Sequence, residues 1–270
     1  MPRNAPVPDG TRPAWGEPLP AREAGVGGIA VCRVAEMTDV SDAAGSAPRP
    51  LREADDRSAE AAVDTAAFIL SLRARGIRDT GVLRAMELVP REIFAPRRFA
   101  DLARADVALP LPCGQTMTSP GTVATMLVAL AVEEGQRVLE IGTGSGYVTT
   151  LLARLGGQVV SVERFATLAE SATEHLKVAQ TRGARIEIGD GLAQRPRERF
   201  DRIVLNGACL SIPESVMALL APGGRLVGAL TVDGLPRLVR MERLVDGALH
   251  QEIGPSLRLS PLASGVASSL

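Results

Sequence analysis

Several residue types are scarce in this chain of 270 residues, and each scarcity argues against a class of function. Aromatic residues make up only 3%, which disfavours a stacking platform for single-stranded RNA or DNA. The cysteines, Cys32, Cys113 and Cys209, are odd in number and far apart. They therefore form neither a CxxC metal site nor a disulfide framework, and they indicate a reducing compartment. Only two histidines occur, His175 and His250, and no clustering around them indicates a metal site or a Ser/His/Asp triad.

The chain also lacks an excess of charge and a long apolar run. Lys and Arg number 30 against 31 Asp and Glu, a formal net charge of -1. This balance disfavours a generally basic nucleic-acid binder, although it leaves room for a local patch. The longest apolar run, residues 123–132, is too short to span a bilayer. Prolines interrupt the N-terminus where a signal peptide needs an apolar stretch. We therefore expect a cytoplasmic protein that binds neither nucleic acid nor membrane.

The first 58 residues differ in composition from the rest of the chain. They are rich in proline, glycine and alanine and show no sustained periodicity. Such a segment cannot bury enough apolar surface to offset the entropy lost on ordering, so we predict a flexible tail over residues 1–58. Residues 59–270 are predicted to form a single domain, with a helical part at 59–134 and an α/β part at 135–270.

The pattern of the helical part predicts helices. Apolar residues at three- and four-residue spacing indicate an amphipathic helix over residues 59–75. A second helix follows Asp79 or Thr80, either of which can cap it. A third begins at Ser119-Pro120, because an N-cap serine followed by proline is typical of a helix start.

From residue 137 onward, strand and helix patterns alternate. Repeated βα units of this length give a parallel sheet with helices on both faces, so we predict an α/β, doubly wound, mostly parallel sheet of the Rossmann-like kind. Ligands of such sheets bind beyond the carboxyl ends of the strands. Strands are expected at 137–141, 159–162, 185–188, 202–205 and 225–230, helices at 148–155, 166–182 and 213–220, a turn at 222–224, and one or two further strands within 238–244 and 251–262.

A glycine-rich turn lies where the first of these strands hands over to a helix. Glycines at alternate positions allow unusual backbone dihedrals and leave no side chain between the backbone and a ligand. Tyr147 stands where a dinucleotide-binding GxGxxG motif would need a small residue. The spacing Glu-x-Gly-x-Gly-x-Gly instead resembles the first motif of class I S-adenosylmethionine-dependent methyltransferases. Its residues are candidates for cofactor binding: Glu140, Gly142, Thr143, Gly144, Ser145 and Gly146.

Two acidic residues follow the next two predicted strands. Glu163 ends the second strand, where a carboxylate can accept hydrogen bonds from both hydroxyls of an adenosine ribose. Asp190 follows the third strand, where it can accept from the adenine amino group. Structural alternatives exist for both, because Glu163 can serve as an ordinary N-cap and Gly189-Asp190-Gly191 as a plain turn.

Two segments upstream of the glycine turn narrow the resemblance. Residues 89–94 read Val-Pro-Arg-Glu-Ile-Phe, and residues 114–120 read Gly-Gln-Thr-Met-Thr-Ser-Pro. Together with residues 138–147, they resemble the protein-L-isoaspartate (D-aspartate) O-methyltransferase family, and the likeness runs from about residue 77 to residue 262. The glycine motif occurs in many methyltransferases, whereas the two upstream segments at this distance are far more specific.

The resemblance implies an activity, a cofactor and a site. Members of the family transfer a methyl group from S-adenosylmethionine, leaving S-adenosylhomocysteine, to the free carboxylate of isoaspartyl residues in damaged proteins. Isoaspartyl peptides and proteins are then transient substrates, and we expect no stable partner. Thr118 takes the position of the family's active-site serine. The segment that closes over cofactor and substrate matches Gln115, Thr116, Met117 and Thr118, and the adenosine-binding positions match Glu163, Arg164, Asp190 and Gly191.

The sequence departs from the family pattern at three places. Thr118 keeps the hydroxyl of the expected serine but adds a methyl group. Asn206 begins a segment where the family usually has Thr-Ala-Ala character, and Ala263 replaces a threonine near the C-terminus. Two alternatives therefore stay open: a methyltransferase acting on a small-molecule acid or hydroxyl, and a non-catalytic relative that only binds the cofactor.

The scarcity of histidine is compatible with methylation of a carboxylate. A carboxylate with an ordinary pKa of about 4 is already ionised at neutral pH, so no general base is required. We expect Thr118 to orient the substrate by a hydrogen bond and His175 to be a surface residue of a helix. No metal is expected, and the sequence does not give the oligomeric state.

Overall fold

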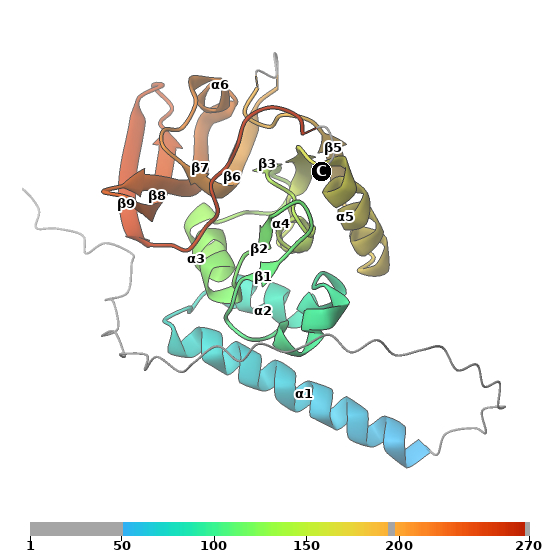
Figure 1. Cartoon of the computed structure of the whole chain (residues 1–270). Coiled ribbons are helices and arrows are strands. Elements are labelled where there is room, and N and C mark those ends of the chain that lie inside the picture. The colour runs from blue at the N-terminus through green and yellow to red at the C-terminus, as the bar shows by residue number, and fades with distance from the viewer. Residues whose placement is uncertain (1–50, 194–197, 268–270) are drawn as a thin grey trace, which may run out of the picture. The chain divides into compact units, whose positions relative to one another are not determined.

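The computed structural model describes residues 51–193 and 198–267, without the side chains of residues 51–60 (Figure 1). By its internal contacts the chain divides into two units, Met1–Val63 and Asp64–Leu270. The first contributes only the beginning of helix α1, Leu51–Ala74, to the described residues. The second unit contains all the other helices and strands described below.

The predicted boundary between tail and domain at residue 58 falls inside α1. Residues 1–50 of the predicted tail lie outside the described residues. The helix begins at Leu51, directly after Pro50, whereas the sequence predicts a start at residue 59. Residues 51–58 are mostly Leu, Arg, Glu, Ala and Asp without proline or glycine, and several of these residues have high helix propensity.

The helical part of the second unit ends in α3, which leads directly into the sheet. Asp79 caps α2 as predicted, its carboxylate accepting from the Val82 amide at 2.8 Å. The side chain of Ser119, in contrast, makes no capping hydrogen bond to α3, and the Asp106 carboxylate accepts from the Gly121 amide at 2.6 Å instead. The elements are α2 (Thr80–Leu88), the 3₁₀ helices η1 (Arg91–Ile93) and η2 (Arg97–Leu102), the antiparallel pair β1 (Leu109–Pro110) and β2 (Thr116–Met117), and α3 (Pro120–Leu130).

A seven-stranded sheet in the order β5-β4-β3-β6-β7-β8-β9 forms the centre of the second unit (Figure 1). Strands β5, β4, β3, β6 and β7 are parallel, and β8 and β9 continue the sheet antiparallel. The predicted fold class is therefore confirmed. The elements are β3 (Arg137–Ile141), α4 (Tyr147–Arg154), β4 (Gln158–Glu163), α5 (Ala166–Val178), β5 (Ala184–Ile188), β6 (Phe200–Cys209), α6 (Glu214–Met217), β7 (Leu220–Val232), β8 (Leu235–Arg243) and β9 (Leu249–Ser256).

Several predicted elements have other bounds in the structure, including the helix predicted at 213–220, which ends at Met217. Helix α5 stops at Val178, short of the predicted residue 182, and Gln180 just beyond it has a positive φ of 50°. The predicted turn at residues 222–224 is a bulge within β7, where the pairing with β6 shifts between Phe200 and Arg202. The predicted strand up to residue 262 ends at Ser256, and the following segment runs back along the end of β6.

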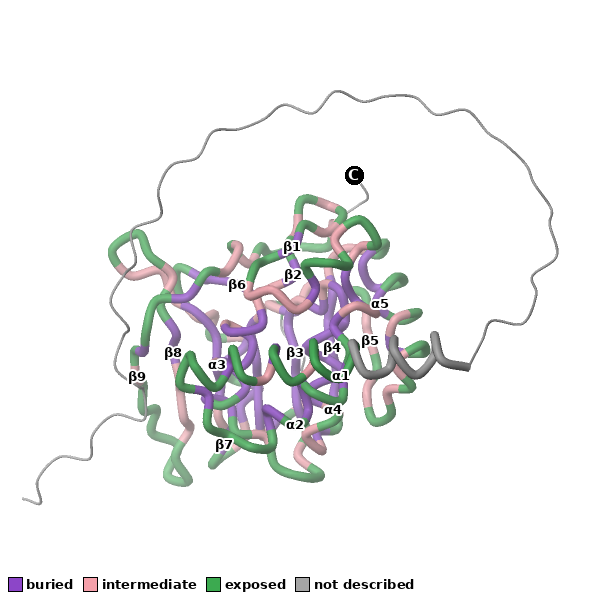
Figure 2. The backbone as a smooth tube through the Cα atoms, turned by 90° about the horizontal axis from the view of Figure 1, so that it is seen from below, coloured by how far each residue is buried: buried purple, intermediate pink, exposed green. Residues whose placement is uncertain are grey.

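The core of the sheet lies on both sides of β3, whose side chains alternate between two environments. Leu139 and Ile141 belong to an apolar cluster that includes Val216 and Met217 of α6. Glu140 lies between them in sequence and therefore points to the opposite face. Buried residues dominate the central strands (Figure 2). In the described parts of the chain, no helix is both long enough and apolar enough to cross a membrane.

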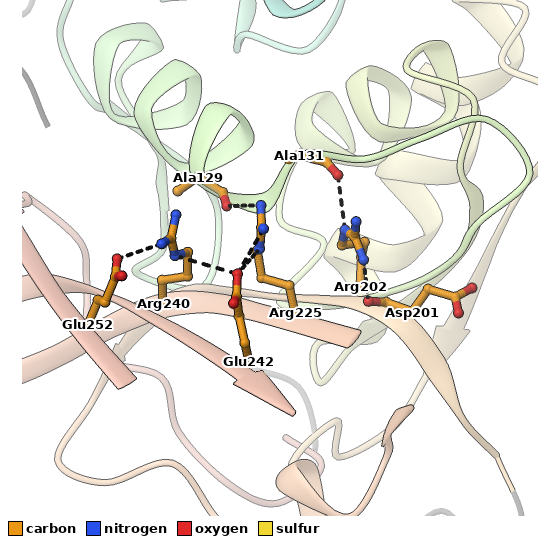
Figure 3. A network of polar contacts seen from close by, with 8 residues as sticks. All are labelled: Ala129, Ala131, Asp201, Arg202, Arg225, Arg240, Glu242 and Glu252. Atoms are coloured by element: carbon orange, nitrogen blue, oxygen red, sulfur yellow. Dashed lines mark hydrogen bonds and ion pairs between the residues drawn. The ribbon is translucent and has the colours of Figure 1, made fainter. Parts of the chain in front are cut away.

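Arginine side chains fasten the C-terminal end of α3 to the sheet (Figure 3). Arg202 of β6 donates to the Ala131 carbonyl at 3.0 Å, and Arg225 of β7 donates to the Ala129 carbonyl at 3.2 Å. The last carbonyls of a helix lack partners within the helix, so these bonds satisfy them. The C-terminal end of α3 is thus fixed to the sheet. Residue 118 lies just before the opposite, N-terminal end of this helix.

Candidate functional site

In the glycine turn between β3 and α4, three glycines have positive φ values, which favour glycine over other residues. Gly142, Gly144 and Gly146 have φ values of 91°, 56° and 85°. Other residues adopt this left-handed region only with strain. The turn is anchored to the neighbouring strand, because the Gly142 amide donates to the Val162 carbonyl at 2.9 Å.

A cavity opens at the carboxyl ends of β3, β4, β5 and β6, beside the position where the strand order reverses. This is where ligands of doubly wound sheets bind. The space between its walls is about 930 Å³ when the open space at the mouth is included. Its lining includes the predicted site residues Gln115, Thr116, Met117, Thr118, Gly142, Thr143, Gly144, Ser145, Glu163, Arg164 and Gly191, and also Phe165, Asn206, Ser260, Pro261, Leu262 and Ala263.

Glu163 lies in the wall of this cavity and is only 4% exposed. One carboxylate oxygen accepts from the Gly144 amide at 2.9 Å, and the other accepts from the Phe165 amide at 3.0 Å. The N-cap position of α5 is Phe165, so Glu163 is not the ordinary N-cap that the alternative interpretation required. Each carboxylate oxygen has a second lone pair, which remains available for hydroxyl groups of a ligand.

Glu140, one of the residues expected to bind the cofactor, does not line the cavity. It is fully buried under the glycine turn, where Thr149 and Ser161 donate to one oxygen and Asn206 donates to the other. Burial raises the pKa of Glu140 to about 7, although the three hydrogen bonds oppose the shift. Asn206 also donates to the Gly142 carbonyl at 3.0 Å, so it joins the buried carboxylate to the turn.

Asp190 is also absent from the lining, whereas its neighbours Gly189 and Gly191 belong to it. Its carboxylate accepts from the Leu192 amide at 2.9 Å and from the Gly265 amide at 2.7 Å. The predicted acceptor for adenine is therefore engaged by the backbone of the C-terminal segment. Gly146, the last glycine of the turn, lies outside the lining as well, because it faces α5.

The C-terminal segment, residues 257–267, forms part of the cavity wall and is called the strap below. Pro261 pairs with Ala208 at the end of β6. Arg164 donates from Nε to the Gly265 carbonyl at 2.9 Å, and the hydroxyls of Thr116 and Ser260 are 2.9 Å apart. The strap thus joins the end of β6, the residue after Glu163, and β2.

Thr118 lies opposite the glycine turn, directly before α3. Its side chain lines the cavity and is half-buried, and among the described residues its hydroxyl has no hydrogen-bond partner. Its carbonyl accepts from the buried Arg91 guanidinium at 2.9 Å. The structure therefore brings Thr118 and the glycine turn, which are distant in sequence, to one cavity.

The prediction that His175 is a surface residue is wrong. It is half-buried in α5, and its Nδ1 lies 2.9 Å from the Ser145 carbonyl. Because a carbonyl only accepts, Nδ1 is the protonated nitrogen of this contact. The ring also lies against Phe94, with centroids 5.7 Å apart in an edge-on arrangement. His175 therefore supports the glycine turn from behind.

Comparison with known proteins agrees with this arrangement. The family described as protein-L-isoaspartate (D-aspartate) O-methyltransferase matches residues 63–267. The chain belongs to this family. The resemblance inferred from residues 89–94, 114–120 and 138–147 is thereby confirmed.

Relatives match over most of their length. A protein-L-isoaspartate O-methyltransferase 2 of Rhodopseudomonas palustris (strain HaA2) is 43% identical over 205 residues, covering 75% of this chain and 94% of the relative. A protein-L-isoaspartate O-methyltransferase of Azorhizobium caulinodans is 43% identical over 219 residues, covering 80% and 99%.

Solved structures share the fold. A Plasmodium falciparum structure described as this methyltransferase in complex with S-adenosyl-L-homocysteine has a TM-score of 0.66 at 21% identity. It covers 73% of this chain and 97% of its own. A second structure, named protein-L-isoaspartate O-methyltransferase, has a TM-score of 0.65 at 22% identity and covers 75% and 67%.

The three departures from the family pattern all line the cavity, namely Thr118, Asn206 and Ala263. Nothing in the sequence indicates that Ser260 and Leu262 take part in the wall or that Asn206 contacts Glu140. A strand pattern ending in Ser-Pro-Leu was the only local signal, and it indicates no ligand. In the described segments, no group of three or more His, Cys, Asp or Glu side chains could hold a metal ion.

Proposed function

We propose that this chain methylates the free carboxylate of isoaspartyl residues in damaged peptides and proteins, with S-adenosylmethionine as the methyl donor. The observation that carries the proposal is the shared cavity: Thr118, the glycine turn and Glu163 line the same space. Membership in the family and the names of relatives at 43% identity support the substrate class.

The residues of the cavity fit a nucleoside with a charged amino-acid tail. Glu163 is fixed by two backbone amides and presents acceptors that suit ribose hydroxyls. The glycine turn offers backbone without intervening side chains to the tail, and the N-terminus of α4 favours a carboxylate. Gly191, also in the lining, packs so closely on Ile141 that a Cβ there would meet this side chain at 2.6 Å. S-adenosylmethionine supplies an electrophilic methyl group on a positive sulfonium.

Chemistry in this cavity requires positioning more than proton transfer. The substrate carboxylate is ionised at neutral pH, so the protein needs no base to activate it. Thr118 is proposed as the catalytic residue that donates its hydroxyl hydrogen to one carboxylate oxygen and aims the other at the methyl group. The buried Met117 beside it gives this part of the wall an apolar side chain, which favours a reaction that neutralises two opposite charges.

The test is an assay with an isoaspartyl peptide and its aspartyl counterpart as matched substrates. We expect methylation of the isoaspartyl peptide alone. Thr118→Ala should lower kcat about tenfold, the effect of one hydrogen bond of ~1–1.5 kcal/mol, and change S-adenosylhomocysteine affinity less than twofold. Thr118→Ser, which keeps the hydroxyl, should retain activity.

The alternatives give different results in the same assay. Turnover of small carboxylic acids or alcohols without peptide methylation would support the small-molecule methyltransferase. Failure of S-adenosylhomocysteine to bind in calorimetry would contradict the assignment of the cavity itself. Equal turnover of Thr118→Ala and the parent chain would remove Thr118 from the site.

The cellular location and the binding partners of the chain are proposed from its sequence. We propose a cytoplasmic location, transient contact with peptide substrates, and no binding of nucleic acid or membrane. Balanced charge and the scattered cysteines support this, and Cys113 and Cys209 are unpaired among the described residues. Localisation of a tagged chain in cells checks it.

A further inference from the structure

Arg91 is a charged residue in the interior whose hydrogen bonds go to backbone. It lies in η1, is 2% exposed, and donates from Nη1 to the Ala103 carbonyl at 2.6 Å. Its Nη2 donates to the Thr118 carbonyl at 2.9 Å and to the Val107 carbonyl at 3.3 Å. One guanidinium thus ties together three chain segments, and one of the three carries the proposed catalytic hydroxyl.

Asp106 holds the same segment from its other side. Its Oδ1 accepts from the Gly121 amide at 2.6 Å, and its Oδ2 pairs with Arg75 at 2.5 Å. A Cβ at Gly121 would lie 2.8 Å from Oδ1, so the carboxylate occupies the space that glycine leaves. The backbone from Thr118 to Gly121 is therefore held at both ends by charged side chains.

Burying the Arg91 guanidinium costs free energy, so a contribution to folding stability alone does not explain this arrangement. Burial lowers the pKa of Arg91 to about 10, the direction expected when a cation loses water. Even a complete buried ion pair can often be replaced by apolar residues without loss of stability. An apolar side chain, however, cannot fix the direction of a carbonyl, whereas the planar fork of arginine holds several acceptors in one geometry.

The same short motif also contacts the cofactor side of the cavity. The Arg91 guanidinium lies 6.0 Å from the ring centroid of Tyr147, the residue that follows the glycine turn. The Phe94 ring lies 5.5 Å from that of Tyr147. Residues 91–94 therefore link the backbone of Thr118 to the start of α4.

We propose that Arg91 and Asp106 are positioning residues for methyl transfer, which fix the backbone on the two sides of Thr118 and so set where its hydroxyl meets the substrate carboxylate. Neither side chain touches the substrate. The proposal rests on the proposed function, because it assigns a geometric requirement to the same reaction.

The experiment compares substitutions at the two ends of α3. Arg91→Lys keeps the charge but cannot hold three acceptors in a planar fork, so kcat with the isoaspartyl peptide should fall about 10- to 100-fold, in line with the cost of a ~1 Å misplacement. The Kd of S-adenosylhomocysteine, measured by calorimetry, should stay within twofold. Asp106→Ala should lower kcat in the same way, and Asp106→Asn, which keeps an acceptor for Gly121, should recover part of the loss.

Arg202→Lys is the matched control. Arg202 also donates to a carbonyl of this region, Ala131, but at the end of α3 away from the cavity (Figure 3). Its substitution should lower Tm, as Arg91→Lys does, and leave kcat within twofold at a temperature well below both transitions. A loss of Tm without loss of kcat would be the signature of a purely structural arginine.

Each outcome of these measurements either supports or contradicts the positioning role of Arg91 and Asp106. If Arg91→Lys lowers kcat no more than Arg202→Lys, or if it weakens S-adenosylhomocysteine binding as much as kcat, the positioning role is wrong. If Arg91→Lys does not fold, the Asp106→Ala and Asp106→Asn pair decides by the same criteria. If the parent chain binds S-adenosylhomocysteine but does not methylate the peptide, the proposed function fails first, and this inference fails with it.

Discussion

Two walls of one cavity are built in opposite ways. The glycine turn and Glu163 come from consecutive βα units, and their geometry depends on backbone: three positive φ values and two amides that bind one carboxylate. The strap wall joins parts far apart in the chain, such as Thr116 and Ser260, which are 144 residues apart. The first wall is encoded by local sequence, whereas the second exists only after the sheet has formed.

This difference predicts how each wall responds to substitution. Residues of the glycine wall are buried and hydrogen-bonded from several sides, so a substitution there removes several interactions together. The side-chain hydrogen bonds that hold the strap are exposed to solvent, so the loss of one of them should have a smaller effect that is confined to the ligand site. The following experiments test that contrast, from the largest expected effect to the smallest.

Glu163→Ala should have the largest effect on cofactor binding. It removes the acceptor of the Gly144 and Phe165 amides together with the acceptors proposed for the ribose, and each hydrogen bond to a charged group is worth ~1.5–3 kcal/mol. We expect the Kd of S-adenosylhomocysteine to rise about 100-fold or more in calorimetry. Glu174→Ala is the control, because Glu174 is exposed and pairs only with Lys177 on the surface of α5. A change below fivefold for Glu163→Ala would contradict the assignment.

Glu140 should make the stability of the glycine wall depend on pH. Its pKa is raised from 4.5 to about 7 in the folded chain. The stabilisation is therefore fully present below pH 4.5 and is lost as the pH rises to about 7, by about 3 kcal/mol at most. Urea unfolding between pH 5 and 8 checks this, and the slope over that range should be smaller for Glu140→Gln than for the parent chain. Equal slopes would show that the carboxyl group is not the titrating one.

Asp190→Ala should have the smallest effect of the three. It leaves the Gly265 amide without its acceptor and loosens the strap, at a cost of ~1 kcal/mol. The Kd of S-adenosylhomocysteine should rise about three- to tenfold while Tm changes little. Asp190→Asn keeps an oxygen for Gly265 and should lie between Asp190→Ala and the parent chain. An effect as large as that of Glu163→Ala would mean that the carboxylate binds adenine directly.

The sequence predicts the glycine wall well because each of its requirements is local. The alternation of strand and helix patterns, the spacing of the glycines and the acidic residue at the end of β4 are all readable within short windows. The resemblance carried by residues 89–94 and 114–120 adds Thr118 to the same site, and the structure brings it there. These features follow from periodicity and backbone geometry, which depend little on distant residues.

The rest was not predictable because it depends on contacts between distant segments. The side chain that accepts a hydrogen bond from an amide at the start of α3 is Asp106. The side chain of Ser119, in the expected capping position, makes no such bond. The role of Asn206 is visible only when β6 lies beside β3 and its amide reaches Glu140. The strap looks like a strand in sequence, because Ser-Pro-Leu after an alternating stretch carries no signal for a cavity wall.

One residue of the central sheet, Ala208 of β6, anchors the strap at the wall of the cavity. Ala208 donates to the Ser260 carbonyl at 2.9 Å and accepts from the Leu262 amide at 2.8 Å. Lifting the strap away from Ala208 therefore breaks two backbone bonds at once, each worth ~1 kcal/mol, in addition to the bonds of Ser260 and Gly265.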